Sequence, residues 1–234
     1  MLFRTPVLIA ALLCSSVLAT AAQVTLDATD YGFRIDSGGP FTSSIVLGWC
    51  PCDPISELRN YFVFDLSSIS GVITAAQLQL DMPAPSGQLP VGGYDSPQAT
   101  ETFQVNEVTS TIAQVLDPFA NVAVYTDLGD GTALGSVVLN PASEGTLVVI
   151  PLNGSALALL NNQAGGQIAL GGSVTTLAKA ASNELVFAGN GGPAFLRQLV
   201  LTVESRVEVP EPGTLWLAAG ILLPLLVRRF RAAP

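Results

Sequence analysis

The stretch RNYFVFDLSSISGVITAAQLQL, residues 59–80, contains two different patterns of apolar residues on either side of one turn. Residues 61–64 are apolar at four consecutive positions, so both faces of this segment are expected to be buried, as in a central β-strand. From residue 76 to residue 82 apolar and polar residues alternate, which predicts a strand with one buried and one solvated face. Two such strands joined by a turn indicate a layered β-structure.

The same alternation recurs along the chain between turn segments rich in Gly, Pro, Asp and Asn. Further strands are predicted at 24–28, 44–47, 102–106, 122–125, 136–139, 146–150, 168–170, 185–188 and 199–203. One short helix is predicted over 156–160, because Asn153 can cap its first turn and Gly165 lies beyond its end. About ten strands with a single short helix predict an all-β fold, a two-sheet β-sandwich of the jelly-roll type.

The composition excludes several classes of function. The chain has 234 residues, of which 12% are charged, and it contains one lysine and no histidine. Without histidine, Ser-His-Asp and Cys-His catalysis and histidine metal sites are excluded. Residues 22–209 carry 17 acidic and 5 basic side chains, a net charge of −12, which argues against binding nucleic acid through its phosphates. No carboxylate pair is marked by its neighbours as glycosidase machinery, so the protein is predicted not to be an enzyme.

The N-terminus has the pattern of a secretory signal peptide. Arg4 precedes an apolar run over 6–13, and Ala19-Thr20-Ala21 fits an A-x-A cleavage site. Residues 1–21 are therefore predicted to be removed on export. An N-terminal membrane anchor is the alternative, which the short apolar run disfavours.

The C-terminal segment 208–234 combines a proline-acid-proline motif, an apolar run and a basic cluster. The residues of the motif and cluster are Pro210, Glu211, Pro212, Arg228, Arg229 and Arg231. As a helix, the apolar run over 214–227 would be about 21 Å long, short for a bilayer core of about 30 Å. The arginines can reach the headgroups, and the positive-inside rule keeps them in the cytoplasm. We therefore expect a transmembrane helix over 214–227, with the domain at 22–207 outside.

This order of motif, short apolar helix and basic cluster resembles the PEP-CTERM sorting signal of Gram-negative bacteria. In that family the signal is the proposed substrate of exosortase, a membrane-embedded cysteine protease-transpeptidase, and its members accompany exopolysaccharide and biofilm genes. The resemblance implies an exported surface or biofilm-matrix protein, held in the inner membrane and then processed by exosortase, with exopolysaccharide as a candidate ligand. The alternatives are a permanently anchored structural protein without a ligand and a polysaccharide-active enzyme.

The stretch at 59–80 also resembles the β-sandwich of DNRLRE-type bacterial surface proteins. In those domains an arginine precedes an FDLS strand end and an A-x-L-x-L strand follows, as Arg59, Asp65 and Leu78 do here. The resemblance extends over residues 30–203 and implies a non-enzymatic extracellular domain. Its architecture is related to that of carbohydrate-binding modules, although a shared fold does not by itself define a function.

Two pairs of residues in the domain are candidate sites. Cys50 and Cys52 in GWCPCDP can form a local disulfide, remain as two free thiols, or bind a metal together with further ligands. Asp127 and Asp130 in TDLGDGT are candidate oxygen ligands for Ca²⁺, and no other cofactor is predicted. The alternative for these aspartates is a β-turn that uses Asp and Gly for their turn chemistry.

Two further residues are expected to have structural roles. Asp65 is expected to cap the loop after its strand through backbone hydrogen bonds rather than to pair with Arg59. Lys179, the single lysine, is expected to be a solvated loop residue.

Overall fold

The fold consists mainly of β-strands in two sheets, as the alternating patterns predict. It comes from a computed structural model, which describes residues 21–37, 40–42, 44–52, 56–85, 92–119, 122–189 and 194–205. Within these residues the strands are β1 (Ala21–Asp27), β2 (Asp30–Ile35), β3 (Pro40–Thr42), β4 (Leu47–Cys50), β5 (Ser56–Asp65), β6 (Val72–Asp81), β7 (Tyr94–Asp95), β8 (Glu101–Glu107), β9 (Ala133–Leu139), β10 (Leu147–Pro151), β11 (Gln167–Val174), β12 (Glu184–Val186) and β13 (Arg197–Glu204). The helices are α1 (Ile112–Leu116), α2 (Val122–Asp130), α3 (Gly154–Asn162) and the 3₁₀ turn η1 (Pro141–Ser143).

The predicted targeting segments lie almost entirely outside the described residues. Residues 1–20 of the predicted signal peptide, which include Ala19, are not described. The same holds for the predicted sorting tail, with its helix at 214–227 and its motif and basic residues Pro210, Glu211, Pro212, Arg228, Arg229 and Arg231. Ala21, the last residue of the predicted signal peptide, is the first residue of β1, so cleavage after it would leave the strand from residue 22 onward. Among the helices that the structure describes, none has the length and apolar content needed to cross a membrane.

Four strands form an antiparallel sheet, called sheet A below, in the order β1-β13-β6-β10. Its side chains alternate between the two faces. Leu78 and Leu80 of β6 point inward and are fully buried, whereas Gln77 and Gln79 are only partly buried. Sheet A therefore buries one face, as the alternation in residues 76–82 predicts.

The second sheet, called sheet B, has the order β7-β12-β4-β5-β11-β8-β9, and β2 pairs with both β5 and β3. Its strand β5 is buried on both faces. Phe62 and Phe64 belong to the main core between the sheets, whereas Tyr61 and Val63 belong to a second apolar cluster on the opposite face. The prediction that residues 61–64 form a central strand is confirmed.

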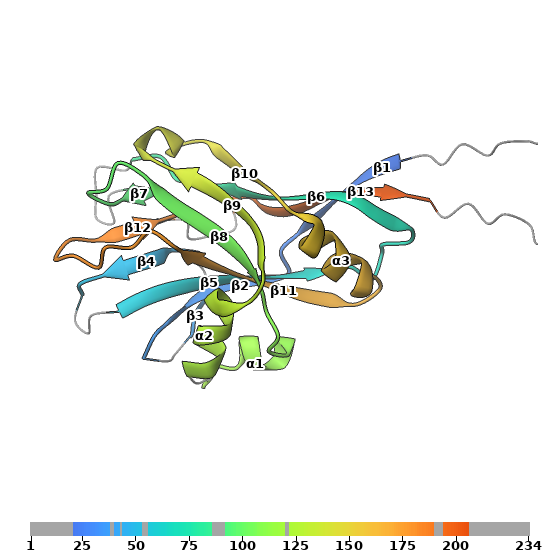
Figure 1. The fold of residues 1–234 in the computed structure, drawn as a ribbon, viewed down its shortest axis with the longest axis horizontal. Coiled ribbons are helices and arrows are strands. Elements are labelled where there is room, and N and C mark those ends of the chain that lie inside the picture. The colour runs from blue at the N-terminus through green and yellow to red at the C-terminus, as the bar shows by residue number, and fades with distance from the viewer. Residues whose placement is uncertain are drawn as a thin grey trace, which may run out of the picture. The chain divides into compact units, whose positions relative to one another are not determined.

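Helices α1 and α2 cover this outer face of sheet B (Figure 1). The predicted strand at 122–125 is wrong, and so is the expectation of a single helix, because 122–125 is the first turn of α2. Val124, Tyr125 and Leu128 are its buried residues, and their spacing places them on one helix face. Gly171 of β11 faces this helix, and a side-chain carbon there would collide with the backbone of Leu128.

The one helix predicted from the sequence, over 156–160, is confirmed as α3, which packs against the main core. The Asn153 side chain accepts a hydrogen bond from the backbone N–H of Ala156, with a distance of 3.1 Å, and so caps α3. Ala156 and Leu160 pack into the main core. Asn161 donates to the carbonyl of Ile73 and accepts from its N–H, which ties α3 to the beginning of β6.

The remaining strand predictions differ from the structure in a few places. The strand predicted at 44–47 starts only at Leu47, as β4, and the short strands β2, β3 and β7 were not predicted. In β1, which was predicted from residue 24, Ala21 pairs with Glu204 and Asp27 pairs with Gln198. The two ends of the described domain therefore lie side by side at one end of sheet A.

Candidate functional site

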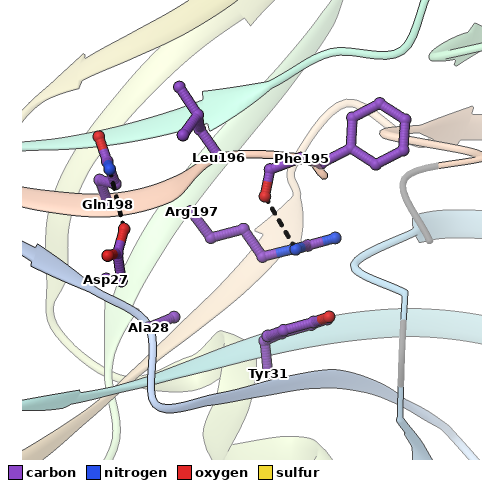
Figure 2. A pocket seen from close by; sticks show the side chains of 7 residues that line it. All are labelled: Asp27, Ala28, Tyr31, Phe195, Leu196, Arg197 and Gln198. Carbon is purple, nitrogen blue, oxygen red and sulfur yellow. Dashed lines mark hydrogen bonds between the residues drawn. The ribbon is translucent and has the colours of Figure 1, made fainter. Parts of the chain in front are cut away.

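A surface pocket of about 430 Å³ lies at the end of sheet A where β1 passes into β2 and β13 begins. We call it the Tyr31 pocket. It is lined by Asp27, Ala28, Tyr31, Phe195, Leu196, Arg197 and Gln198 (Figure 2). Because Gln198 pairs with Gln79 near the end of β6, the pocket lies at the opposite end of this strand from α3, which is bonded to Ile73.

One wall of the pocket is a cation stacked on an aromatic ring. Arg197 alternates with the buried Leu199 and Leu201 along β13, so its side chain points inward between the sheets. Figure 2 shows its guanidinium over the ring of Tyr31, and its central carbon lies 3.8 Å from the ring centroid. The guanidinium also donates to the carbonyl of Phe195, with a distance of 3.0 Å.

Burial lowers the pKa of Arg197, and the nearby Tyr31 and Asp81 act in the opposite direction. The side chain remains a cation at any ordinary pH, because an arginine pKa is so high. The stack therefore gives the pocket a flat wall that combines an aromatic surface with fixed positive charge.

The rim of the pocket is polar and uncovered. Gln198 Nε2 donates to Asp27 Oδ1 across the β1–β13 pair, with a distance of 2.8 Å. Asp27 is exposed, so its carboxylate can accept further hydrogen bonds from outside the domain. This pair supplies an acceptor and an amide at a fixed position beside the stack.

The other side of the pocket is apolar. Leu196 is 41% exposed and Phe195 is partly exposed. The backbone between them is held against β6, since the N–H of Leu196 donates to Asp81 Oδ2 (2.8 Å) and its carbonyl accepts from the N–H of Asp81 (3.0 Å). Apolar and aromatic surface beside a few fixed planar polar groups suits a ligand with an apolar ring face and a rim of hydroxyl groups.

None of the site residues predicted from the sequence lies in this pocket. One local signal was available, namely a charged residue, Arg197, at an inward position of the alternating strand over 197–203. Its stacking partner Tyr31 lies on β2, a strand that was not predicted, so the pair could not be assembled from local patterns.

The candidate calcium residues lie on α2 and not in a β-turn. Asp127 accepts hydrogen bonds from the N–H and hydroxyl of Thr109 and from the N–H of Ser110. Burial alone would raise the pKa of Asp127, but these hydrogen bonds outweigh it and lower the pKa. Asp130 Oδ1 lies 3.1 Å from the Arg59 guanidinium. Within the described residues, no group of three or more His, Cys, Asp or Glu side chains is placed to hold a metal ion.

The two cysteines lie at the end of β4. The structure joins Cys50 and Cys52 in a disulfide, with their Cα atoms 5.1 Å apart. Cys50 packs in a small apolar cluster with Leu58 and Leu185, so one half of the pair is part of the packing of sheet B.

The two residues expected to be structural are found in such roles. Asp65 Oδ1 accepts from the N–H of Ser67, with a distance of 2.8 Å, so the predicted loop cap is confirmed. Lys179 is in a loop and its side chain is half-exposed, but it is more than a solvated residue. Its ammonium lies 2.7 Å from Glu57 and above the ring of Trp49.

The comparisons with known proteins add no assignment to this geometry. No model of a protein family matches the chain, and a search of curated proteins gives no match either. The functional argument therefore depends on the residues and the pocket themselves.

Proposed function

We propose that the chain is an exported, non-enzymatic surface or biofilm-matrix protein that binds exopolysaccharide in the Tyr31 pocket. Export and sorting are supported by the A-x-A site at 19–21 and by the tail at 208–234, with its resemblance to exosortase substrates. Binding is supported by one observation above the others. This observation is the aromatic–cation stack of Tyr31 and Arg197 beside the Asp27–Gln198 rim.

A jelly-roll architecture is part of this proposal. Counting only β1, β5, β6, β8, β9, β10, β11 and β13 gives eight strands in the orders 1-8-3-6 in sheet A and 2-7-4-5 in sheet B. Neighbours are then the first and last strands, the second and seventh, the third and sixth, and the fourth and fifth. This nesting is expected of two interlocked Greek keys, and β2, β3 and β4 are then additions before the second strand.

The charge of the chain favours a neutral glycan. Residues 22–209 carry a net charge of −12, so a polyanionic polysaccharide would be repelled by the domain as a whole. A neutral polysaccharide is not repelled by this negative charge. Its hydroxyl groups can donate to the carboxylate of Asp27 and accept from the amide of Gln198.

Two acidic residues, Asp27 and Asp81, lie at or near the pocket. Because glycosidases act through a pair of carboxyl groups, a polysaccharide-active enzyme is the alternative to a binding protein. A polysaccharide-active enzyme remains distinguishable by experiment, because it would shorten the glycan during incubation and the Asp27→Asn variant would not.

The binding proposal is tested with the full-length protein, purified in detergent, and exopolysaccharide from the producing organism. Saturable binding is expected, and Gln198→Ala should weaken it by about fivefold or more, because a neutral hydrogen bond and the anchoring of Asp27 are lost. Gln77→Ala, on the outer face of β6 two residues before Gln79 and outside the pocket lining, is the matched control and should bind like the wild type. Absence of saturable binding, or equal affinity for both variants and the wild type, would overturn the proposal.

The sorting proposal is tested by intact mass spectrometry of the cell-associated and released forms. The released form is expected to begin at residue 22 and to lack the segment 228–234. A chain in which Pro210, Glu211 and Pro212 are replaced by alanine should stay in the membrane at full C-terminal length. A released wild-type protein that keeps residues 228–234 would contradict the proposed removal of the tail by exosortase and would favour permanent anchoring.

A further inference from the structure

The Tyr31 pocket has a neighbour that shares one of its walls. A second surface pocket, of about 260 Å³, is lined by residues from the end of β6, by the turn before β10, by Leu147 and by Phe195. Phe195 also lines the Tyr31 pocket. The two hollows are therefore adjacent, and the side chain of Phe195 stands between them.

The register of sheet A places the two hollows in a row across the strands. Asp27 pairs with Gln198 across β1 and β13, and Gln198 pairs with Gln79 across β13 and β6. Two residues further along β6, on the same face, Asp81 pairs with Leu147 of β10. The row crosses four strands, and with about 4.8 Å per strand and the two-residue step along β6 its outer members, Asp27 and Leu147, are about 16 Å apart.

The backbone at the shared wall is held firmly in place. The carbonyl of Phe195 accepts from the Arg197 guanidinium, and Leu196 makes two hydrogen bonds with Asp81. Figure 2 shows the ring of Phe195 on the far side of Arg197 from Asp27 and Gln198. The aromatic ring is therefore presented from a fixed backbone, so little conformational freedom is lost when a ligand packs on it.

The second hollow repeats the chemistry of the first with a different arrangement. Its lining combines the carboxylate of Asp81 with the exposed side chain of Leu147, which is 42% exposed, and the ring of Phe195. Each hollow thus offers one carboxylate acceptor, Asp27 in the first and Asp81 in the second, and both share one aromatic surface. Two similar hollows in a row match a ligand that repeats along its length.

We infer that the two hollows are neighbouring subsites of one groove, which binds an internal stretch of a neutral polysaccharide chain across the end of sheet A. The ring of Phe195 is the surface on which the chain packs as it passes from one subsite to the next. This inference rests on the proposed glycan-binding function. It adds that the protein recognises the polymer along its length and not a single sugar or a chain end.

The test measures affinity against ligand length. The producing organism's exopolysaccharide is partially hydrolysed and separated by size, and each fraction is titrated into the full-length protein in detergent by calorimetry. The wild type should bind longer fragments about tenfold more tightly than the shortest fragment that binds, with a plateau once the groove is filled. Phe195→Leu, which removes the ring but keeps an apolar side chain, should reduce the affinity for long fragments to that for short ones.

A variant confined to the second hollow separates the groove from the Tyr31 pocket. Leu147→Ala should weaken the binding of long fragments by about threefold or more and leave that of the shortest fragment within about twofold. Val149→Ala is the matched control, since Val149 lies two residues further along the same face of β10 and is 39% exposed. Thermal unfolding of each variant verifies that the domain is folded.

Each outcome of these titrations bears on a different claim. If all fragment lengths bind with equal affinity, or if Leu147→Ala and Phe195→Leu bind like the wild type, the groove is refuted and the Tyr31 pocket stands as a single-sugar site. If no fragment of any length binds, the proposed function itself fails.

Discussion

The two sheets of this domain are built from similar strands but have opposite outer faces. In sheet B, Tyr61 and Val63 turn outward and are buried beneath α1 and α2. In sheet A, the outward positions hold Gln77 and Gln79, which no helix covers among the described residues. The strand sequences explain this difference, because β5 has consecutive apolar residues whereas β6 alternates apolar and polar residues. The covered face of sheet B should therefore contribute to stability, which substitutions can test. The uncovered face of sheet A remains accessible to a ligand.

The largest effect is expected where the second core is broken. Leu128→Ala should lower the free energy of unfolding by about 3 kcal/mol, because Leu128 is fully buried between α2 and sheet B and the truncation leaves a cavity. Urea unfolding measures this loss. A loss under about 1 kcal/mol would mean that α2 rests loosely on the sheet, and the comparison between the two sheets would then fail.

A glycine on the covered face provides the second test. Gly171→Ala should cost about 2 kcal/mol, because the new methyl group would meet the backbone of Leu128 and α2 would have to shift. Gly154→Ala is the control, since a side chain at Gly154 meets open space within α3. Thermal melts of the two variants should therefore diverge, and equal melting temperatures would contradict the close approach of α2 to β11.

The carboxylate that ties α2 to the turn before α1 gives a smaller effect that depends on pH. Burial tends to raise the pKa of Asp127, but its hydrogen bonds from Ser110 and Thr109 lower it below the ordinary value of 3.8. Because the folded-state pKa is lowered, the stabilisation is fully present above the unfolded-state pKa and is lost as the pH falls through the folded-state pKa. Asp127→Asn should cost about 1 kcal/mol at pH 7 and flatten the acid side of the stability profile. The same acid slope in wild type and variant would argue against this role.

The addition of calcium is expected to change the melting temperature of the protein very little. The oxygens of Asp127 and Asp130 already accept hydrogen bonds from Thr109, Ser110 and Arg59, so a cation would have to displace these partners. The melting temperature should be the same in excess Ca²⁺ and in excess chelator. A clear rise with Ca²⁺ that Asp127→Asn abolishes would instead support the calcium site considered from the sequence.

The smallest effect is expected on the uncovered sheet. Val149→Thr, on the outer face of β10, should change the free energy of unfolding by less than about 0.5 kcal/mol, because the side chain is 39% exposed and loses little buried surface. Urea unfolding beside Leu128→Ala is the direct comparison. A cost as large as that of Leu128→Ala would show that the outer face of sheet A is covered in solution.

Much of the fold could be predicted from local patterns, and the site could not. Alternation located the long strands, and the Asn153 cap located α3. The strand predicted at 122–125 failed because Val-Ala-Val-Tyr suits a strand locally, and only the spacing to Leu128 and the apolar face of β5 favour a helix. The pocket depends on pairing between distant segments, since Asp27 and Gln198 are 171 positions apart. No local period encodes such a pair.

The pairing of β1 with β13 has a mechanical consequence. The proposed groove holds its ligand at the first residues of β13, while the chain leaves the described domain after the last residues of the same strand. A pull between the ligand and a C-terminal attachment would therefore run along β13. The antiparallel bonds to β1 and β6 would then be loaded together, in shear, and would not open one after another as a zipper does. The strand that frames the pocket would thus act as the tension element of a tether.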